Sequence, residues 1–191
     1  MKIEDFSIFK DIPTLKTERL ILRKLKKSDL DDVFEYSSDE EVPHFLLWES
    51  HKSKAVTKAY INRVIKWYKS GQFYDWAIEF NGKMIGLCGF SKIDILNDTA
   101  EVGYVLNRKF WGQGIATEAV KAVVNFGFRT LSLLRIEAQY VEDNIRSKRV
   151  LEKCGFVHEG IRRKSLKIHG IMKNVSTASI LSEDFFKNKI N

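Results

Sequence analysis

The sequence contains few cysteines and no long apolar run, and each absence excludes a class of protein. Cys88 and Cys154 are the only cysteines among 191 residues and form no spacing signature, which argues against a disulfide scaffold or a cysteine-rich metal site. No apolar stretch approaches the roughly 20 residues that a membrane span needs. Nothing before Pro13 resembles a signal peptide. We therefore expect a reduced, cytoplasmic setting and no membrane association.

The sequence also lacks the residue spacing of a metal site and two common nucleotide-binding fingerprints. The segment 112–117 lacks the third glycine of a Rossmann fingerprint and has no Lys-Ser or Lys-Thr for a Walker loop. The four histidines show no ligand spacing, so no metal is predicted: His44, His51, His158 and His169. Neither motif explains how this chain would hold a phosphate.

Apolar and basic residues are both plentiful. The 44% of apolar residues, with 13 Phe and 4 Trp, can build the core of a single domain. We expect that domain to span residues 1–191, with its core at about 17–182. The 32 basic and 25 acidic residues give a net charge of +7, which suits an anionic partner or a merely solvated surface. Aromatic and basic residues do not interleave at stacking spacing, so no direct nucleic-acid site is predicted.

The apolar pattern predicts a chain of mixed helices and strands. Asn81-Gly82 indicates a tight hairpin, and Gly155 suits the position just after a helix. Ser28 looks like the N-cap of the first helix. The second helix would bury Val56, Tyr60, Ile61, Val64, Ile65 and Tyr68. The expected strands are 19–24, 74–80, 83–93, 99–106, 135–141, 160–167 and 173–181, and the expected helices 28–38, 53–70, 115–130 and 144–153.

The segment 109–118, KFWGQGIATE, is the strongest candidate for a ligand site. Gly112 and Gly114 have no Cβ atoms to keep a ligand from the main chain. Helical periodicity begins at Ile115, so several N–H groups at this junction have no helical acceptor. Such a junction binds anions, although a plain tight turn is the alternative.

This turn and its surroundings resemble a known family. Lys109-Phe-Trp-Gly112-Gln-Gly114 resembles the R/Q-x-x-G-x-G/A element of the GNAT superfamily of acetyl-CoA-dependent N-acetyltransferases. Residues 99–156 resemble its ribosomal-protein N-acetyltransferase branch, which is RimJ/RimL-like. The motifs of this segment follow one another in the same order as in that branch, and the last of them are Asn144-Ile-Arg-Ser147 and Gly155-Phe156. Lys109 departs from the usual Arg or Gln and lacks the fork geometry of Arg.

The resemblance implies an α/β (α+β) GNAT fold. Its mixed, mostly antiparallel seven-stranded sheet would be splayed in the middle, between strands 99–106 and 135–141, and flanked by about four helices. Acetyl-CoA would lie in the gap as co-substrate. Asn144 would contact the pantetheine arm or cap the last helix, and Arg146, Lys148 and Arg149 would attract the 3′-phosphate. The implied cofactor residues are Val105, Leu106, Lys109, Gly112, Gln113, Gly114, Ile115, Ala116, Thr117, Asn144, Ser147 and Arg149.

The same resemblance assigns catalytic candidates. Glu101 would act as the base, directly or through water, although a strand carboxylate can equally be a surface group. Ser147 is favoured over Tyr140 as the acid that protonates the leaving thiolate, although a serine at a helix start is common. The backbone N–H of Leu106 is the expected donor to the oxyanion.

The acceptor is less defined than the donor. An α-amine with a pKa of about 7.8 needs about 1 kcal/mol to become neutral at pH 7, whereas a lysine amine near 10.4 needs about 4.6. This favours protein N-termini or weakly basic small amines. Acidic residues Asp39, Glu40 and Glu41 and aromatic residues Phe45, Trp48, Tyr74 and Trp76 would shape the acceptor cleft, unless they serve a solvated helix end and the core.

Three functions remain open. The preferred function is acetylation of the N-terminal amine of a ribosomal or other cytoplasmic protein, by direct attack in a ternary complex. The second has a small amine as acceptor, such as a polyamine, an amino acid or an aminoglycoside. The third is a non-catalytic CoA-binding or RNA-associated regulatory module. A monomer or a homodimer, through the last hairpin or the sheet edge, is compatible with the sequence.

Overall fold

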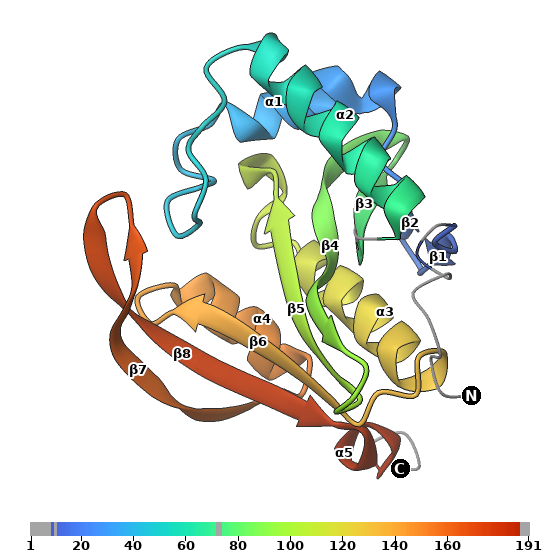
Figure 1. Ribbon diagram of the computed structural model, residues 1–191, viewed down its shortest axis with the longest axis vertical. Helices are drawn as coiled ribbons and strands as arrows, with labels where there is room; N and C mark the ends of the chain where they lie inside the picture. The colour runs from blue at the N-terminus through green and yellow to red at the C-terminus, as the bar shows by residue number, and fades with distance from the viewer. Residues whose placement is uncertain (1–8, 10, 72–73, 188–191) are drawn as a thin grey trace.

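The computed structural model describes residues 9, 11–71 and 74–187 (Figure 1). Its strands are β1 (Leu15–Lys16), β2 (Leu20–Arg23), β3 (Tyr74–Phe80), β4 (Lys83–Asp94), β5 (Thr99–Leu106), β6 (Arg135–Val141), β7 (Val157–Ile168) and β8 (Ile171–Leu181). Its α-helices are α1 (Leu30–Ser37), α2 (Lys54–Ser70), α3 (Ile115–Arg129), α4 (Ile145–Lys153) and α5 (Ser182–Lys187). Two short 3-10 turns, η2 (Lys27–Asp29) and η3 (Arg108–Phe110), precede α1 and α3.

The strands form one mixed sheet in the order β1-β2-β3-β4-β5-β6-β8-β7. Every pairing is antiparallel except that of β5 with β6. The expected α/β fold with a mixed, mostly antiparallel sheet is therefore confirmed. The two-residue strand β1 and helix α5 were not expected. None of the described helices is both long and apolar enough to cross a membrane.

The sheet is splayed between β5 and β6. The two strands pair only over three positions, from Thr99 with Arg135 to Glu101 with Glu137. Beyond them β5 continues along β4 to Leu106, while β6 continues along β8 to Val141. Figure 1 shows β5 and β6 diverging from a common lower end. This splay lies between the two strands where the family resemblance implied it.

The buried Trp76 fixes which face of the sheet α3 covers. Its side chain is 0% exposed and packs edge-on against Phe126 of α3, with ring centroids 5.2 Å apart. Alternation along β3 turns Asp75 to the opposite face, where the Tyr68 hydroxyl of α2 donates to the Asp75 carbonyl at 2.8 Å. The expectation that Trp76 shapes an acceptor cleft is therefore wrong, because its large apolar ring fills the core. Tyr74 likewise packs against Phe9, with centroids 4.6 Å apart.

The first two helices differ in detail from the sequence expectation. Ser28 is not the N-cap of α1, because it lies inside the turn η2. Instead the Asp29 carboxylate accepts a bond from the Lys26 N–H at 2.8 Å. In α2, Val56 is 47% exposed, and the fully buried Thr57 takes the inward position. Thr57 is drawn inward because its hydroxyl bonds His51 Nδ1 at 2.9 Å.

The predicted turns adopt the expected backbone conformations. Asn81 and Gly82 have φ of 49° and 79° and join β3 to β4. After α4, Gly155 has φ of 86° and the Phe156 N–H donates to the Leu151 carbonyl at 3.0 Å, which ends the helix as predicted. The last hairpin is longer than expected, since β7 begins at Val157 and continues through two irregularities in its pairing with β8.

Candidate active site

A cavity of about 460 Å³ lies at the splay of the sheet. Its walls come from the segment 41–46, β5, the start of α3, β6 and α4. The predicted site residues that line it are Tyr140, Ser147, Val105, Leu106, Gly112, Gly114, Ile115, Ala116, Thr117, Asn144 and Arg149. Segments far apart in the sequence thus meet at one site.

The N-terminus of α3 forms one wall of this cavity. Gly112 and Gly114 have φ of 77° and 76°, a region that side chains disfavour. The Glu118 N–H is the first to donate to a helical carbonyl, that of Gly114, at 3.0 Å. The preceding N–H groups of the first turn, at residues 115–117, lack such an acceptor. They form an anion site that the helix dipole strengthens.

Arg19 braces this turn from the N-terminal part of the chain. Its Nε donates to Glu118 Oε2 at 2.7 Å and its Nη1 to the Gln113 carbonyl at 3.1 Å. The Thr17 hydroxyl donates to Glu118 Oε1 at 2.5 Å. Burial is the largest single influence and raises the pKa of Glu118, but the bonds from Thr17 and Arg19 together outweigh it and lower this pKa. Because Arg19 neutralises Glu118, an anion at the helix start is not repelled by it.

Basic residues of α4 stand beside the same wall. Arg146, Arg149 and Lys153 line the cavity. The Arg146 guanidinium lies 4.4 Å from the centre of the Trp111 ring, and the Trp111 Nε1 donates to the Leu106 carbonyl at 2.8 Å. Positive charge and unpaired N–H groups therefore converge, as a ligand with several phosphates requires.

The main chain of β5 presents N–H groups to the splay. The Asn107 N–H donates to the Ile85 carbonyl at 2.8 Å, so alternation turns the main-chain groups of Gly103 and Val105 toward β4. Those of Tyr104 and Leu106 then face the side where β6 has diverged. The Leu106 N–H therefore has the orientation expected for the oxyanion donor. Val105 lines the cavity, but its main-chain groups face β4, so the prediction that they would pair with the cofactor is wrong.

Ser147 is held at the start of α4 by two neighbours. Its N–H donates to Asn144 Oδ1 at 3.1 Å, so Asn144 is the N-cap of α4. Its hydroxyl lies 2.8 Å from the hydroxyl of Tyr104, which also lines the cavity. Burial raises the pKa of Tyr104, so this hydroxyl stays protonated at neutral pH. The pair can act as a short proton relay.

Glu101 lies beside the cavity but not on its wall. It occupies the last position at which β5 pairs with β6. The Ser91 hydroxyl donates to its Oε1 at 3.1 Å, and Gln139 Nε2 donates to its Oε2 at 3.1 Å. Gln139 does line the cavity. A water molecule beside Gln139 could therefore link Glu101 to a bound amine.

Lys109 and Gln113 are predicted cofactor residues that do not line the cavity. The Lys109 Nζ instead pairs with Oε1 of Glu35 on α1 at 2.9 Å. Bonds from Lys83 and then Lys109 lower the pKa of Glu35 to about 2. The Gln113 side chain donates back to the Lys109 carbonyl at 3.0 Å.

The segment 39–50 covers one end of the cavity. Glu41 and Phe45 line it, while Asp39 pairs with Arg108 at 2.7 Å and Glu40 with Lys52 at 3.0 Å. The hairpin of β7 and β8 approaches this segment, and His169 Nε2 lies 3.2 Å from the Pro43 carbonyl (Figure 1). Of the three predicted acidic groups, only Glu41 faces the cavity.

Sequence reasoning missed Tyr104, Trp111 and Arg19 as site residues. Tyr104 meets Ser147 across 43 positions of sequence, and Arg19 meets Glu118 across 99. No local pattern signals contacts of such separation. Cys154 is buried, which raises its pKa to about 12. Within the described residues, no group of three or more His, Cys, Asp or Glu side chains could hold a metal ion.

A mixed sheet that opens at its centre beside a helix start with free N–H groups is the architecture that the resemblance to acetyl-CoA-dependent transferases implied. The comparisons with known proteins make the class specific. The model of the acetyltransferase (GNAT) domain matches residues 19–157. The chain belongs to the GNAT family and is an acetyl-transferring enzyme.

Individual relatives span almost the whole chain. An uncharacterized N-acetyltransferase, p20, of Bacillus licheniformis is 35% identical over 90% of this chain and 98% of its own length. The ribosomal protein uS5-alanine N-acetyltransferase of Escherichia coli is 28% identical over 90% and 92%. A crystal structure of a GNAT-family acetyltransferase from Bacillus anthracis has a TM-score of 0.80 and 28% identity, covering 90% and 99%. The predicted resemblance to ribosomal-protein N-acetyltransferases is thus confirmed at the level of relatives.

Proposed function

We propose that this enzyme transfers the acetyl group of acetyl-CoA to a primary amine, with the N-terminal α-amine of a ribosomal or other cytoplasmic protein as the preferred acceptor. The observation that supports it is one cavity bordered by the α3 anion site, the Leu106 main chain and the Tyr104–Ser147 pair. The relative that acts on ribosomal protein uS5 supports the choice of acceptor.

The residues present fit acetyl-CoA. Gly112 and Gly114 leave the first turn of α3 open, since an added Cβ at Gly112 would meet no atom within 4 Å and one at Gly114 only Arg19, at 3.5 Å. The N–H groups of this turn would bind the pyrophosphate, and Arg146 and Arg149 would hold phosphate charge. When bound, acetyl-CoA supplies an acyl carbon already activated as a thioester.

The chain's own groups would then complete a direct transfer. The acceptor nitrogen bonds to the acyl carbon while the Leu106 N–H stabilises the oxyanion. The nitrogen loses its proton through water to Glu101, and the carbon–sulfur bond breaks as Ser147 protonates the sulfur. Tyr104 would pass its proton to Ser147 as it takes up another from water, so that both hydroxyls end the cycle protonated. Tyr140, the other hydroxyl on the wall, is the alternative acid.

A small amine is the second candidate acceptor. The segment 39–50 covers the cavity and is fixed through Pro43 by His169, which favours a compact acceptor. Release of free CoA thiol would be measured with a peptide bearing a free N-terminus, the same peptide with a blocked N-terminus and an internal lysine, and a set of small amines. We expect the free N-terminus to give the largest kcat/KM. Turnover confined to small amines would refute the preferred acceptor.

A further inference from the structure

Asp75 on β3 is a carboxylate without a partner. Among the described residues, no hydrogen bond or ion pair engages its side-chain oxygens. The Asp75 side chain is half-buried. In the part of the chain that the structure describes, every side-chain oxygen that lacks a hydrogen-bond partner is in contact with solvent, so solvent reaches the Asp75 oxygens. Burial raises the pKa of Asp75 to about 7. An enclosed carboxylate without a cation is costly, which suggests that a ligand supplies the missing charge.

Two glycines lie between Asp75 and the cavity. Asp75 pairs in register with Gly89, and Gly89 with Gly103 of β5. A Cβ at Gly89 would lie 2.4 Å from Asp75 Oδ1, so the carboxylate leans over β4. A Cβ at Gly103 would meet no atom within 4 Å, and Gly103 lines the cavity. The Asp75 carboxylate therefore lies above Gly89, one strand away from the open space at Gly103, although neither Asp75 nor Gly89 lines the cavity.

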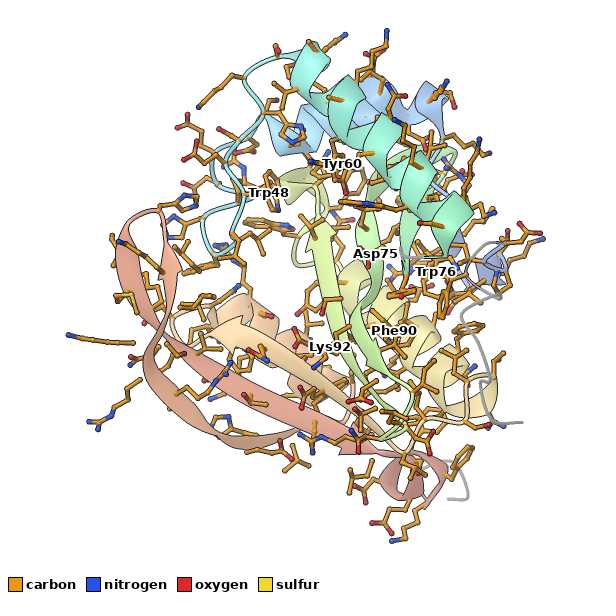
Figure 2. All side chains as sticks on the ribbon, viewed as in Figure 1. Trp48, Tyr60, Asp75, Trp76, Phe90 and Lys92 are labelled. Atoms are coloured by element: carbon orange, nitrogen blue, oxygen red, sulfur yellow. The ribbon has the colours of Figure 1, made fainter. Side chains whose placement is uncertain are left out.

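The walls around Asp75 are aromatic. Burial chiefly raises the pKa values of Tyr36, Tyr60 and Tyr68, and the nearby charge of Asp75 raises them further. Figure 2 shows Tyr60 and Asp75 in the region between α2 and the sheet, with Trp48 on the neighbouring segment. Aromatic rings beside a carboxylate attract cations by both charge and ring quadrupole. This environment suits an ammonium or guanidinium group.

Asp75 is too far from the splay to act on the reacting nitrogen. Neighbouring strands lie about 4.8 Å apart, so a carboxylate above β4 is roughly 7 Å from the far edge of β5, where the acyl group would lie. A hydrogen bond spans about 3 Å. A cation on Asp75 would therefore be a different group of the same acceptor.

We propose that Asp75 binds a second, non-reacting cationic group of the acceptor, so that the preferred acceptor is a primary amine with another positive charge several ångströms away. This inference rests on the proposed function and deepens it. A diamine meets this description, and so does a peptide N-terminus followed by a basic residue. Both kinds of acceptor carry two positive charges, of which one would lie at the splay and the other at Asp75.

The experiment compares matched dications and monocations. The CoA-saturated enzyme would be titrated calorimetrically with 1,4-diaminobutane and butylamine, and with two peptides that carry Lys or Gln at the second position. Their kcat/KM values would be measured with acetyl-CoA. For the wild type we expect a preference of about tenfold or more for the dication in at least one pair. Whichever pair shows the preference tells whether the acceptor is a small diamine or a peptide.

Asp75→Asn should abolish that preference and leave acetyl-CoA affinity unchanged. Asp31→Asn is the control, because it removes the same charge from a side chain that is 78% exposed on α1. Gly103→Val is the second variant, whose side chain would enter the open space between the splay and Asp75. Both site variants should lose the dication preference while circular dichroism stays unchanged.

Two outcomes would overturn the inference. One is a wild type that binds dications no better than monocations, and the other is an Asp75→Asn enzyme that keeps the wild-type preference. The proposed function fails separately, if no amine gives thiol release. Dication binding that depends on Asp75 but leads to no turnover would sustain the inference and end the proposed function.

Discussion

Ser147 is fixed by its N–H bond to Asn144 and by its hydroxyl contact with Tyr104. A hydroxyl held from both sides can transfer a proton without first finding its orientation. Tyr140 lines the same cavity, but no hydrogen bond links its hydroxyl to another described residue. At the scale of single residues, these contacts favour the proposal that Ser147 gives the proton to the leaving sulfur.

Ser147→Ala should lower kcat about 100-fold, because it removes the general acid. The dissociation constant of acetyl-CoA should change less than about twofold, as measured by calorimetry. Ser165→Ala on the exposed strand β7 is the control for loss of a serine hydroxyl. If Tyr140→Phe lowers kcat more than Ser147→Ala does, Tyr140 is the acid.

Glycine at position 114 is required for both backbone and ligand reasons. Gly114→Val would force a branched side chain into positive φ and place it beside the α3 anion site. Acetyl-CoA affinity should fall at least about tenfold. Gly82→Val introduces similar strain at φ of 79° in a distant hairpin and should leave affinity unchanged. Equal affinity of both variants would contradict a phosphate site at Gly114.

At the scale of elements, the strongly patterned segments were predictable and their meeting points were not. The bounds of β5 and β6 were predicted to the residue, because each alternates or is continuously apolar between clear turns. The predictions for Ser28 and Val56 were wrong because the hydrogen bonds of Asp29 and Thr57 outweighed the local sequence signals. The contact of Tyr104 with Ser147 depends on how β5 and α4 pack, which a local pattern does not contain.

Glu35 joins α1 to two later elements and makes the protein sensitive to acid. It pairs with Lys83 of β4 at 2.5 Å and with Lys109 of η3 at 2.9 Å. Its pKa of about 2 lies below the unfolded value, so its stabilisation is present above about pH 4.5 and is lost as pH falls toward 2.

Glu35→Gln should reduce the free energy of unfolding by about 1 kcal/mol at pH 7, since the side chain is 29% exposed and partly screened. Urea denaturation at pH 7 and pH 3 provides the measurement. The difference between variant and wild type should shrink at pH 3. A constant difference at both pH values would contradict the linkage.

At the scale of the whole molecule, two parts of the sheet meet over three paired positions. The strands β1–β5 and the strands β6–β8 diverge beyond Glu101 and Glu137. Helix α3 packs across the junction, with Ile136 and Phe90 both close to Gly127. The opening at the splay is thus part of the core architecture and not a surface loop.

The unpaired Asp75 should make this architecture less stable than it could be. Its pKa of about 7 lies above the unfolded value, so its contribution to stability is present below about pH 4 and is lost as pH rises toward 7. The surrounding Tyr36, Tyr60, Tyr68 and Cys88 have raised pKa values and do not titrate in this range.

Asp75→Asn should therefore raise Tm at pH 7.5, and by less at pH 4.5, in thermal scans followed by circular dichroism. His51 titrates in both proteins and cancels in the comparison. An equal or lower Tm for the variant at pH 7.5 would show that the carboxylate is stabilised by the fold.

Acetyl-CoA-dependent thiol release in the presence of amines is the most direct measurement of the central claim. With purified protein and acetyl-CoA, the account predicts release that rises with amine concentration, yields an N-acetylated product by mass spectrometry and falls about 100-fold in Ser147→Ala. Thiol release that never exceeds the rate without amine, across free N-termini, mono-amines and diamines, would contradict it.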